Sequence, residues 1–322
     1  NIAVNFKPDW TWIKNRDATD SHQLFDSNRG VTNVLESDAT TVEVANDDTL
    51  TAFISTGFSL GDDVTVNTDD ESYVSWNWKA NGGTTVTNEA GSIDSTVQAN
   101  TDAGFSIVTW SGNETNGATI GHGLSSAPKI IITKCRSHAT SWIFGIGQIT
   151  GTVNDYLTLN TTSAKANSST FYQSYTSDSN TTFTVGVSGA DEMNRNTGGT
   201  ARTYVSYCFH EVEGYSKMGG YVGNNVASGP FIYLGFRPAW IMIKRSNDTE
   251  HWHILDNKRD PFNGVDNELW ASLPNDESSG TERGDFLSNG FKIRGNNAGY
   301  NTSHNYIYMA FAEAPFKYAN AR

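Results

Sequence analysis

The chain has 322 residues, of which 37% are apolar and 12% aromatic, so it is long enough for two or three folded domains and is not disordered. Its net charge of -13 argues against a nucleic-acid partner, because affinity for a phosphate backbone rests mainly on lysine and arginine. No apolar run approaches the ~18 residues of a membrane span and no signal peptide is visible, so we expect no membrane insertion. The chain begins with Asn1, which is typical of a processed product or a fragment.

Short runs of Val, Ile, Thr, Phe, Tyr and Trp alternate with clusters of Gly, Asn and Asp along the whole chain. Helix formers are never concentrated in one segment. This pattern is typical of strands joined by turns, and it predicts an all-β protein.

The first predicted strand lies in FKPDWTWIKNRD at residues 6–17, and similar runs return as APKIIITKCRSH at 127–138 and FRPAWIMIKRSND at 236–248. In each copy a proline stands six residues before a lysine: Pro8 and Lys14, Pro128 and Lys134, Pro238 and Lys244. A proline can open a strand, and we expect the lysine to end it by carrying its ammonium group into water.

The residues between each proline and lysine are apolar at consecutive positions, which predicts strands that are buried on both faces. These positions are Trp10, Trp12 and Ile13, then Ile130, Ile131 and Ile132, then Trp240, Ile241, Met242 and Ile243.

A second recurring element is predicted as a hairpin with a polar tip at residues 57–78, and it returns at 182–209 and 290–311. The middle copy has a longer loop, which a hairpin tip tolerates at little cost.

A third recurring element joins the repeats, because GFSIVTW begins 24 residues before Pro128 and GYSKMGG begins 24 residues before Pro238. The chain therefore divides into repeats of about 110 residues, too long for a solenoid period of ~20 to 50. We predict three tandem β-sandwich, jelly-roll-like units at 1–103, 104–213 and 214–322. The first unit lacks its first strand, and PFKYANA at 315–321 is the expected counterpart at the other end of the chain.

Three segments resemble a β-rich repeat domain of virion proteins from marine bacteriophages, namely cyanophages and pelagiphages. They are residues 6–30, DFLSNGFKIRG at 285–295 and the final run YIYMAFAEAPFKYANAR. The middle repeat departs from the pattern, because SWIFGIGQITG replaces HQLFDSNRG. The resemblance implies a tail-fibre-like or uncharacterised virion structural protein, located in the extracellular particle, with other virion proteins as partners.

Two groups of residues could bind a metal. His251 and His253 have the i, i+2 spacing that places both imidazoles on one face of a strand, with Asp256 nearby, but a third ligand is not evident. An acidic tip at Asp62, Asp63, Asp69, Asp70 and Glu71 carries oxygen ligands suited to Ca²⁺, but it lacks the spacing of a known calcium loop. An exposed strand face and a solvated turn are the preferred interpretations, so no metal and no cofactor are predicted.

No pattern of catalytic residues is visible. Serine nucleophile motifs and phosphate-binding loops are missing, and Cys135 and Cys208 have no patterned histidine partner. The two cysteines are interpreted as small buried residues, with a disulfide as the alternative. We therefore predict that the protein is not an enzyme.

The recurring pair of aspartate and arginine and the numerous tryptophans are two further candidate ligand sites. Asp26 and Arg29 recur at the same spacing as Asp256 and Arg259, which indicates a salt-bridged turn, with ligand binding as the alternative. Nine tryptophans exceed what three small cores need, so exposed aromatic side chains for sugar or protein contacts are expected.

The sequence and the resemblance together favour a structural protein of a marine phage virion, a tail-fibre-like or receptor-binding appendage without catalysis. That role would fit a homotrimer and a host surface glycan as a partner. The alternatives are a capsid-decorating or scaffold virion protein, and a secreted bacterial adhesin or glycan-binding module.

Overall fold

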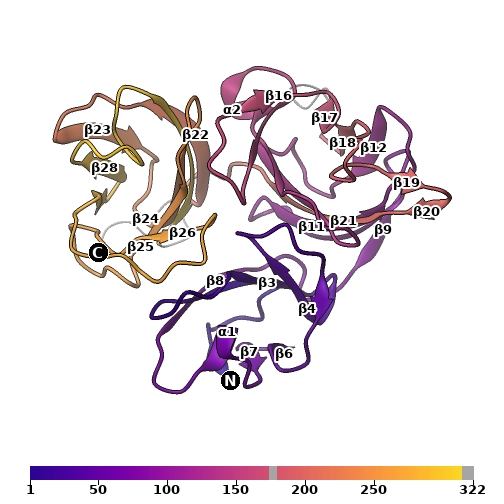
Figure 1. The fold of residues 1–322 in the computed structure, drawn as a ribbon, viewed down its shortest axis with the longest axis horizontal. Helices are drawn as coiled ribbons and strands as arrows, with labels where there is room; N and C mark the ends of the chain where they lie inside the picture. The colour runs from indigo at the N-terminus through magenta and orange to yellow at the C-terminus, as the bar shows by residue number, and fades with distance from the viewer. Residues whose placement is uncertain (174–179, 314–322) are drawn as a thin grey trace.

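The computed structural model describes residues 1–173 and 180–313, and the described residues form 29 strands and two helices of four residues each. This confirms the prediction of an all-β protein. The strands form three units, each with a large inner sheet and a three-stranded outer sheet, arranged around a common centre (Figure 1). No described helix is long and apolar enough to cross a membrane.

The first unit has an inner sheet of five strands in the order β5-β4-β3-β2-β8 and an outer sheet in the order β1-β7-β6. The inner strands are β2 (Trp10–Asn15), β3 (Gln23–Asp26), β4 (Gly30–Glu36), β5 (Val44–Ala45) and β8 (Tyr73–Trp78). The outer strands are β1 (Ile2–Ala3), β6 (Leu50–Ile54) and β7 (Gly57–Leu60), and helix α1 (Val64–Asn67) lies between β7 and β8.

The second unit has an inner sheet of eight strands in the order β16-β15-β14-β13-β21-β11-β10-β9 and an outer sheet in the order β12-β18-β17. The inner strands are β9 (Val86–Asn88), β10 (Ser95–Asn100), β11 (Phe105–Ser111), β13 (Ile130–Cys135), β14 (Ile143–Gly145), β15 (Asp155–Thr158), β16 (Ala166–Asn167) and β21 (Thr203–Phe209). The outer strands are β12 (Ala118–Gly121), β17 (Tyr172–Gln173) and β18 (Thr182–Val185); helix α2 (Gly147–Thr150) and the pair β19 (Asn196–Thr197) and β20 (Thr200–Ala201) complete the unit.

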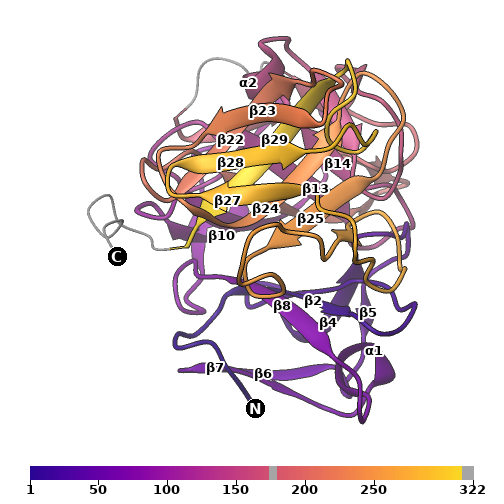
Figure 2. The same ribbon diagram turned by 90° about the vertical axis from the view of Figure 1, so that its left-hand side faces the viewer.

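The third unit has an inner sheet in the order β22-β29-β24-β25-β26 behind an outer sheet in the order β23-β28-β27 (Figure 2). The inner strands are β22 (Ser216–Val222), β24 (Pro238–Arg245), β25 (Trp252–Asp256), β26 (Leu269–Trp270) and β29 (Asn305–Ala312). The outer strands are β23 (Ser228–Tyr233), β27 (Gly284–Leu287) and β28 (Gly290–Arg294).

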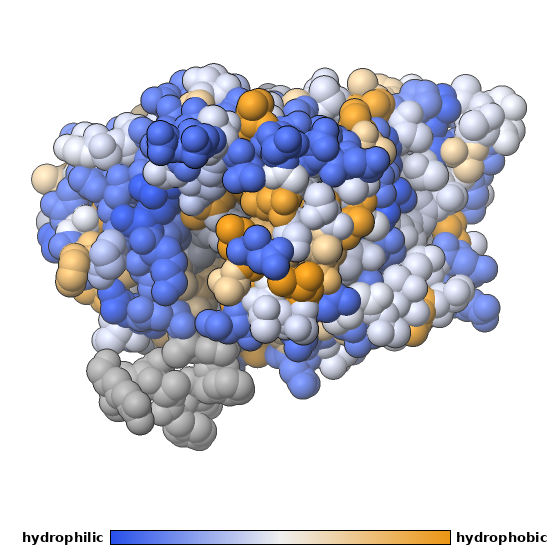
Figure 3. All heavy atoms as spheres, turned by 90° about the horizontal axis from the view of Figure 1, so that it is seen from below, coloured by the Kyte–Doolittle hydropathy of each residue, from blue (hydrophilic) through white to orange (hydrophobic). Residues whose placement is uncertain are grey.

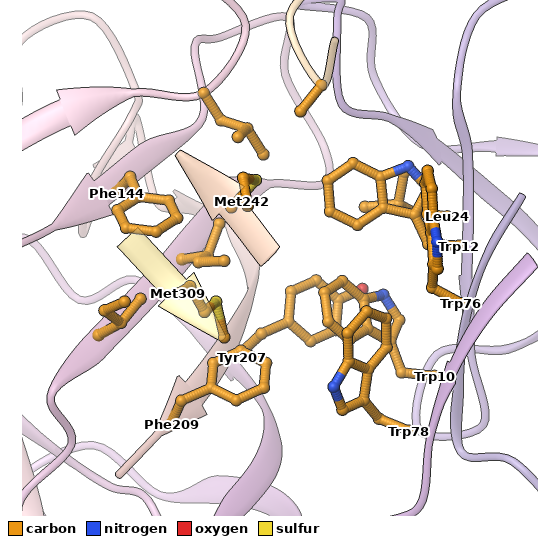
Figure 4. Close-up of a cluster of buried hydrophobic side chains, with 14 of the residues drawn as sticks. Trp10, Trp12, Leu24, Trp76, Trp78, Phe144, Tyr207, Phe209, Met242 and Met309 are labelled. Atoms are coloured by element: carbon orange, nitrogen blue, oxygen red, sulfur yellow. The ribbon is translucent and has the colours of Figure 1, made fainter. Parts of the chain in front are cut away.

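The three inner sheets meet in one large cluster of buried apolar side chains, which we call the shared core (Figure 4). Smaller cores lie within each unit, between its inner and outer sheets. In β13, Ile130 and Ile132 face the shared core whereas Ile131 faces the core of its own unit. An antiparallel sheet usually buries one face, but these inner sheets bury both, which explains the consecutive apolar residues in β2, β13 and β24.

The tryptophans fill the shared core instead of the surface. Eight of the nine are buried, and seven of them belong to the shared core: Trp10, Trp12, Trp76, Trp78, Trp142, Trp240 and Trp252. The expectation of exposed tryptophans was therefore wrong, because it counted three cores and the fold has four.

The predicted hairpins at 57–78, 182–209 and 290–311 are also wrong. In the first of these segments β7 pairs with β1 and β6 in the outer sheet, whereas β8 pairs with β2 in the inner sheet. The same separation holds for β18 and β21 and for β28 and β29. In each segment the two strands lie in opposite layers of one sandwich. Strands of both layers have the same period-two pattern of apolar residues, so the pattern does not distinguish this arrangement from a hairpin.

The sheets divide the chain differently from the predicted boundary at residue 104. Strands β9 and β10, at residues 86–100, pair with each other and with β11, so they extend the inner sheet of the second unit. In the part of the chain that the structure describes, the first and third units have no equivalent strands, and a repeat found by self-similarity cannot assign such an insertion to a unit.

Candidate functional site

The edge of β8 is the feature that breaks the equivalence of the three units. Strands β8, β21 and β29 occupy the same place, each beside the central strand of its inner sheet. Strand β11 covers the other edge of β21, and β22 covers the other edge of β29. Within the described residues no strand covers β8, which therefore ends its sheet.

The pairing of β8 with β2 identifies which backbone groups face the open edge. Arg16 N–H donates to the carbonyl of Ser72 at 2.8 Å, and hydrogen-bonded pairs alternate along an antiparallel ladder. The backbone N–H and C=O groups of Tyr73, Ser75 and Asn77 consequently point away from β2. At the equivalent positions of the second unit these groups bond to β11.

A groove of about 1310 Å³ runs along this edge. Strand β8 forms one side, residues 3–6 and 212–215 form others, and the end of β29 at Ala312 and Glu313 also lines it. Its volume exceeds the ~300–1,000 Å³ of a typical small-molecule site, so it is large enough for a segment of polypeptide.

The wall of the groove contains aromatic residues that are already packed. Trp78 contacts Trp240 and Phe311 with ring centroids 5.7 and 5.5 Å apart, and Trp76 Nε1 donates to Asp256 Oδ2 at 3.0 Å. Because Trp78 and Trp240 are each only 5% exposed, they offer little ring face for stacking a sugar. An open strand edge beside buried aromatic residues is suited to adding an extended peptide strand.

Ionic contacts also join neighbouring units. Glu43 of the first unit pairs with Arg136 of the second at 2.7 Å, and Glu277 of the third unit pairs with Arg16 of the first at 2.7 Å. Backbone hydrogen bonds accompany them, from Glu43 N–H to Arg136 O and from Glu277 N–H to Arg16 O. The equivalent bond between the second and third units runs from Lys165 N–H to Ser246 O, so all three junctions have the same backbone contact.

The recurring pair of aspartate and arginine belongs to these junctions. Asp26 and Arg29 form an ion pair whose side chains are both fully buried, and Tyr207 of the second unit donates its hydroxyl to Asp26 at 2.7 Å. Asp256 and Arg259 repeat this arrangement at 2.6 Å, with Trp76 as the donor from the first unit. The salt-bridged turn was the correct interpretation of the pair.

Ile146 replaces the aspartate at the equivalent position of the middle unit and is a member of the shared core. The junction between the second and third units therefore buries an apolar side chain where the other two bury an ion pair. This explains why the middle repeat departs from the others at SWIFGIGQITG.

The three recurring lysines are buried, contrary to the expectation that they reach water. Lys14, Lys134 and Lys244 are each fully buried and donate to backbone carbonyls. Two of these bonds cross between units, from Lys134 to Thr40 O at 3.1 Å and from Lys244 to Thr162 O at 3.2 Å. Burial lowers the pKa of each of the three ammonium groups from 10.5 to about 8. Backbone carbonyls replace water around all three lysines, and for Lys134 and Lys244 one of these carbonyls belongs to the neighbouring unit.

These lysines should make the protein more stable as the pH rises from ~8 to ~9.5. In that window the unfolded chain binds more protons than the folded chain, because the folded pKa lies below the unfolded one, so the free energy of unfolding increases with pH. Each lysine should contribute on the order of 1 kcal/mol to the increase. Urea unfolding across this range should show that Lys134→Met reduces the increase, whereas Lys258→Met, at an exposed position, leaves it unchanged. An increase of the same size in both variants would contradict this account.

The histidines considered as metal ligands have other contacts. His253 is buried and its Nδ1 contacts Glu268, which also accepts from Tyr300 and pairs with Arg283. His251 Nδ1 lies 3.1 Å from Ser272 Oγ. Burial alone would lower the pKa of His253, but its hydrogen bonds to the carboxylates of Glu250 and Glu268 raise it. In the described ranges no group of three or more His, Cys, Asp or Glu side chains could hold a metal ion.

The acidic tip forms local hydrogen bonds. Asp63 caps helix α1 by accepting from Thr65 N–H at 2.9 Å and also accepts from Asn46 Nδ2 at 2.7 Å. Glu71 accepts from Asn15 Nδ2 at 2.6 Å, while Asp62, Asp69 and Asp70 lie in the loops on either side of α1. The tip is thus anchored to the inner sheet of the first unit through Asn15.

The two cysteines are free and buried, as the preferred interpretation predicted. Burial raises the pKa of both thiols, which keeps them protonated at neutral pH.

Sequence reasoning predicted that the first unit lacks a strand but did not identify β8 as the strand left at the edge, and it missed the glutamates at the junctions. The predicted counterpart strand at 315–321 lies outside the described residues. Glu43 and Glu277 follow their aspartates at different separations, so no common spacing marks them. Arg16 and Arg136 do recur two residues after Lys14 and Lys134, and that spacing was the available signal.

The fold and the site define a protein of three β-sandwich units that share one core and, within residues 1–173 and 180–313, leave the edge of β8 uncovered. A family model described as "Domain of unknown function (DUF7483)" matches residues 1–315, so the chain belongs to that family. Comparison with curated proteins and with solved structures gave no match.

Proposed function

We propose that the chain is a structural module of a marine phage virion, a tail-fibre-like appendage that contacts the host surface without catalysis. The resemblance of its repeats to marine phage virion proteins supports this role. Three sandwiches are joined by a shared core and by buried hydrogen bonds between units, and such close packing suits a component of a particle. The alternatives are a capsid-decorating or scaffold virion protein, or a secreted bacterial adhesin or glycan-binding module.

The placement of exposed aromatic side chains favours surface recognition over decoration. Among the described residues the strongly exposed aromatic side chains all belong to the third unit: Phe231 is 44%, Tyr233 60% and Phe262 82% exposed. Phe231 and Tyr233 lie on the outer strand β23, where Lys217 Nζ lies 5.3 Å from the centre of the Tyr233 ring. Seen from below, much of the surface is hydrophilic, with a group of apolar side chains near the middle and smaller apolar areas elsewhere (Figure 3).

The proposed role predicts that this aromatic patch binds cells. Fluorescently labelled protein should bind some members of a panel of marine cyanobacteria and heterotrophic bacteria, and the double variant Phe231→Ala/Tyr233→Ala should lose most of that binding. The double variant should melt at the same temperature as the wild type, since the two side chains are exposed. Val86→Ala, which truncates an exposed side chain of the second unit, is the matched control.

Immunogold labelling of purified marine phage particles should place the chain on a tail appendage. Labelling spread over the capsid would favour the decorating role, and labelling of bacterial cells alone would favour an adhesin. Release of oligosaccharides from the bound cells would contradict the absence of catalysis.

A further inference from the structure

The outer sheet of the third unit, formed by β23, β28 and β27, turns one face away from the core of its unit and towards the viewer in Figure 2. Ile232, Phe291 and Phe286 lie opposite one another on these three strands and are buried in that core. Side chains that are directly opposite on neighbouring strands share a face, and successive side chains alternate between faces. The residues that alternate with these three therefore project outwards, onto a surface that we call the outer face.

Two rows of paired residues cross the outer face from β23 to β27: Phe231, Lys292 and Asp285 in the first, and Tyr233, Gly290 and Leu287 in the second. Gly290 leaves no room for a side chain, because an added Cβ would collide with the carbonyl of Ile232. The ring of Phe231 lies beside it, with Cε2 3.1 Å from the place of that Cβ. Aromatic rings, charged groups and bare backbone therefore adjoin one another on this face.

A third aromatic side chain stands at the far edge of the sheet. The side-chain amide of Asn263 donates to the carbonyl of Phe286 in β27 at 3.1 Å and accepts from its N–H at 2.8 Å. These two bonds hold the loop along the edge of β27, as a further strand would be held. Phe262 precedes Asn263 and is 82% exposed. Because neighbouring strands lie ~4.8 Å apart, the backbone positions that carry the aromatic residues at the two edges are about 14 Å apart.

Two ammonium groups beside the aromatic rings have no carboxylate partner among the described residues. Lys292 and Lys217 donate to backbone carbonyls, at 2.6 and 3.0 Å. The carboxylate of Asp285 is paired with Arg294, which also lies 3.8 Å from Glu282. Although acidic residues outnumber basic ones in the chain by 35 to 22, this face keeps two unpaired positive charges, which attract an anionic ligand.

We propose that the outer face binds a polysaccharide that carries carboxylate or sulfate groups. This assignment rests on the proposed function, since it gives the chemistry of the ligand that the chain would contact on the host surface. Sugar rings have apolar C–H faces that stack on aromatic rings and hydroxyl groups that bond to polar side chains, so a face that offers both suits them. The two ammonium groups select an acidic polysaccharide over a neutral one.

A polypeptide strand or a bilayer suits the same face less well. Pro230 has no N–H, and the pairing of β23 with β28 shifts register between Ser228 and Phe231, so the free edge of β23 is a poor template for another strand. A bilayer needs a continuous apolar area, whereas Lys292 and Asp285 interrupt the apolar residues here.

Affinity electrophoresis in gels that contain a soluble polysaccharide tests the proposal. Alginate, which carries carboxylates, or dextran sulfate should retard the protein, whereas uncharged dextran should not. Raising NaCl from ~0.05 to ~0.5 M should weaken this binding, because salt screens the attraction of exposed charges.

The variants Lys217→Gln/Lys292→Gln and Tyr233→Ala should each bind the acidic polysaccharide at least tenfold more weakly than the wild type. Lys79→Gln, at an exposed position of the first unit, is the matched control and should bind as the wild type does. Equal melting temperatures of the variants and the wild type would show that all of them are folded.

Equal retardation of the double lysine variant and the wild type would overturn the proposal, as would equal binding of dextran. Tighter binding of single-stranded DNA than of either acidic polysaccharide would assign the face to nucleic acid instead. If the protein binds cells through Phe231 and Tyr233 but neither acidic polysaccharide retards it, the ligand assigned here is wrong and the proposed function stands. Retardation that depends on the two lysines, without binding to any cell in the panel, would support the acidic ligand and contradict the proposed function.

Discussion

Replacing Trp240 with alanine is expected to lower the free energy of unfolding by roughly 3 to 5 kcal/mol, the usual cost of truncating a buried large aromatic residue. Trp240 is 5% exposed and packs against Trp76 and Trp78 of the first unit as well as Phe311 of its own. The cavity would therefore open at the junction of two units, where neither unit can close it alone.

Thermal unfolding by calorimetry or circular dichroism measures this effect. Because all three units bury side chains in the shared core, the whole chain should unfold in one transition that shifts to lower temperature in the variant. Phe231→Ala, at a 44% exposed site on the outer sheet, is the matched control and should change stability by no more than ~0.5 kcal/mol. An unchanged midpoint, or separate transitions for the three units in the wild-type protein, would contradict the shared core.

Replacing Arg29 with leucine is expected to destabilise the fold by about 3 to 5 kcal/mol, because it leaves the buried carboxylate of Asp26 without its counter-charge and removes one of the two arginine partners of Glu43. The Arg29 side chain is fully buried and pairs with Asp26 and, at 2.8 Å, with Glu43. Burial by itself would raise the pKa of Glu43, but hydrogen bonds and charges from Arg136 and Arg29 hold it below its ordinary value. Glu43 therefore stabilises the folded state above its unfolded pKa of 4.5, and that contribution is lost as the pH falls through its lower folded pKa.

The pH dependence separates this prediction from a packing effect. Urea unfolding should show the largest difference between the wild type and Arg29→Leu near neutral pH, and a smaller difference in acid, where the orphaned carboxylates become protonated. Arg237→Leu removes a partner from Glu313 at an exposed pair and should cost about 1 kcal/mol or less at any pH. A loss of stability in Arg29→Leu that does not change with pH would refute the role assigned to the ion pair.

The contacts between the units could be predicted from the sequence only in part. The recurrence of Asp26 with Arg29 and of Asp256 with Arg259 indicated a salt-bridged turn, because an aspartate three residues before an arginine can reach it within one turn. Their donors, Tyr207 and Trp76, come from neighbouring units 181 and 180 residues away in the chain. No local pattern encodes such a pairing.

The amino-acid sequence by itself determined the all-β class, the threefold recurrence and the burial of both faces of β2, β13 and β24, since each of these is a property of local composition and period. A run such as Ile130 to Ile132 shows that both faces of a strand are covered, but it does not show by what.

Only the tertiary structure decided the identity of that cover. It placed the inner sheets of the other two units over one face, moved Lys14 and its counterparts from water into junctions, and separated β7 from β8 into opposite sheets. The reason is that the hydrophobic effect is non-directional and does not depend on how far apart two residues are in the sequence. The same alternating pattern of apolar residues is therefore compatible with a hairpin, a sandwich or a packed ring of units. Among the described residues β8 ends the first unit's inner sheet, and its place there depends on where the chain crosses between units, which is a property of the assembled fold.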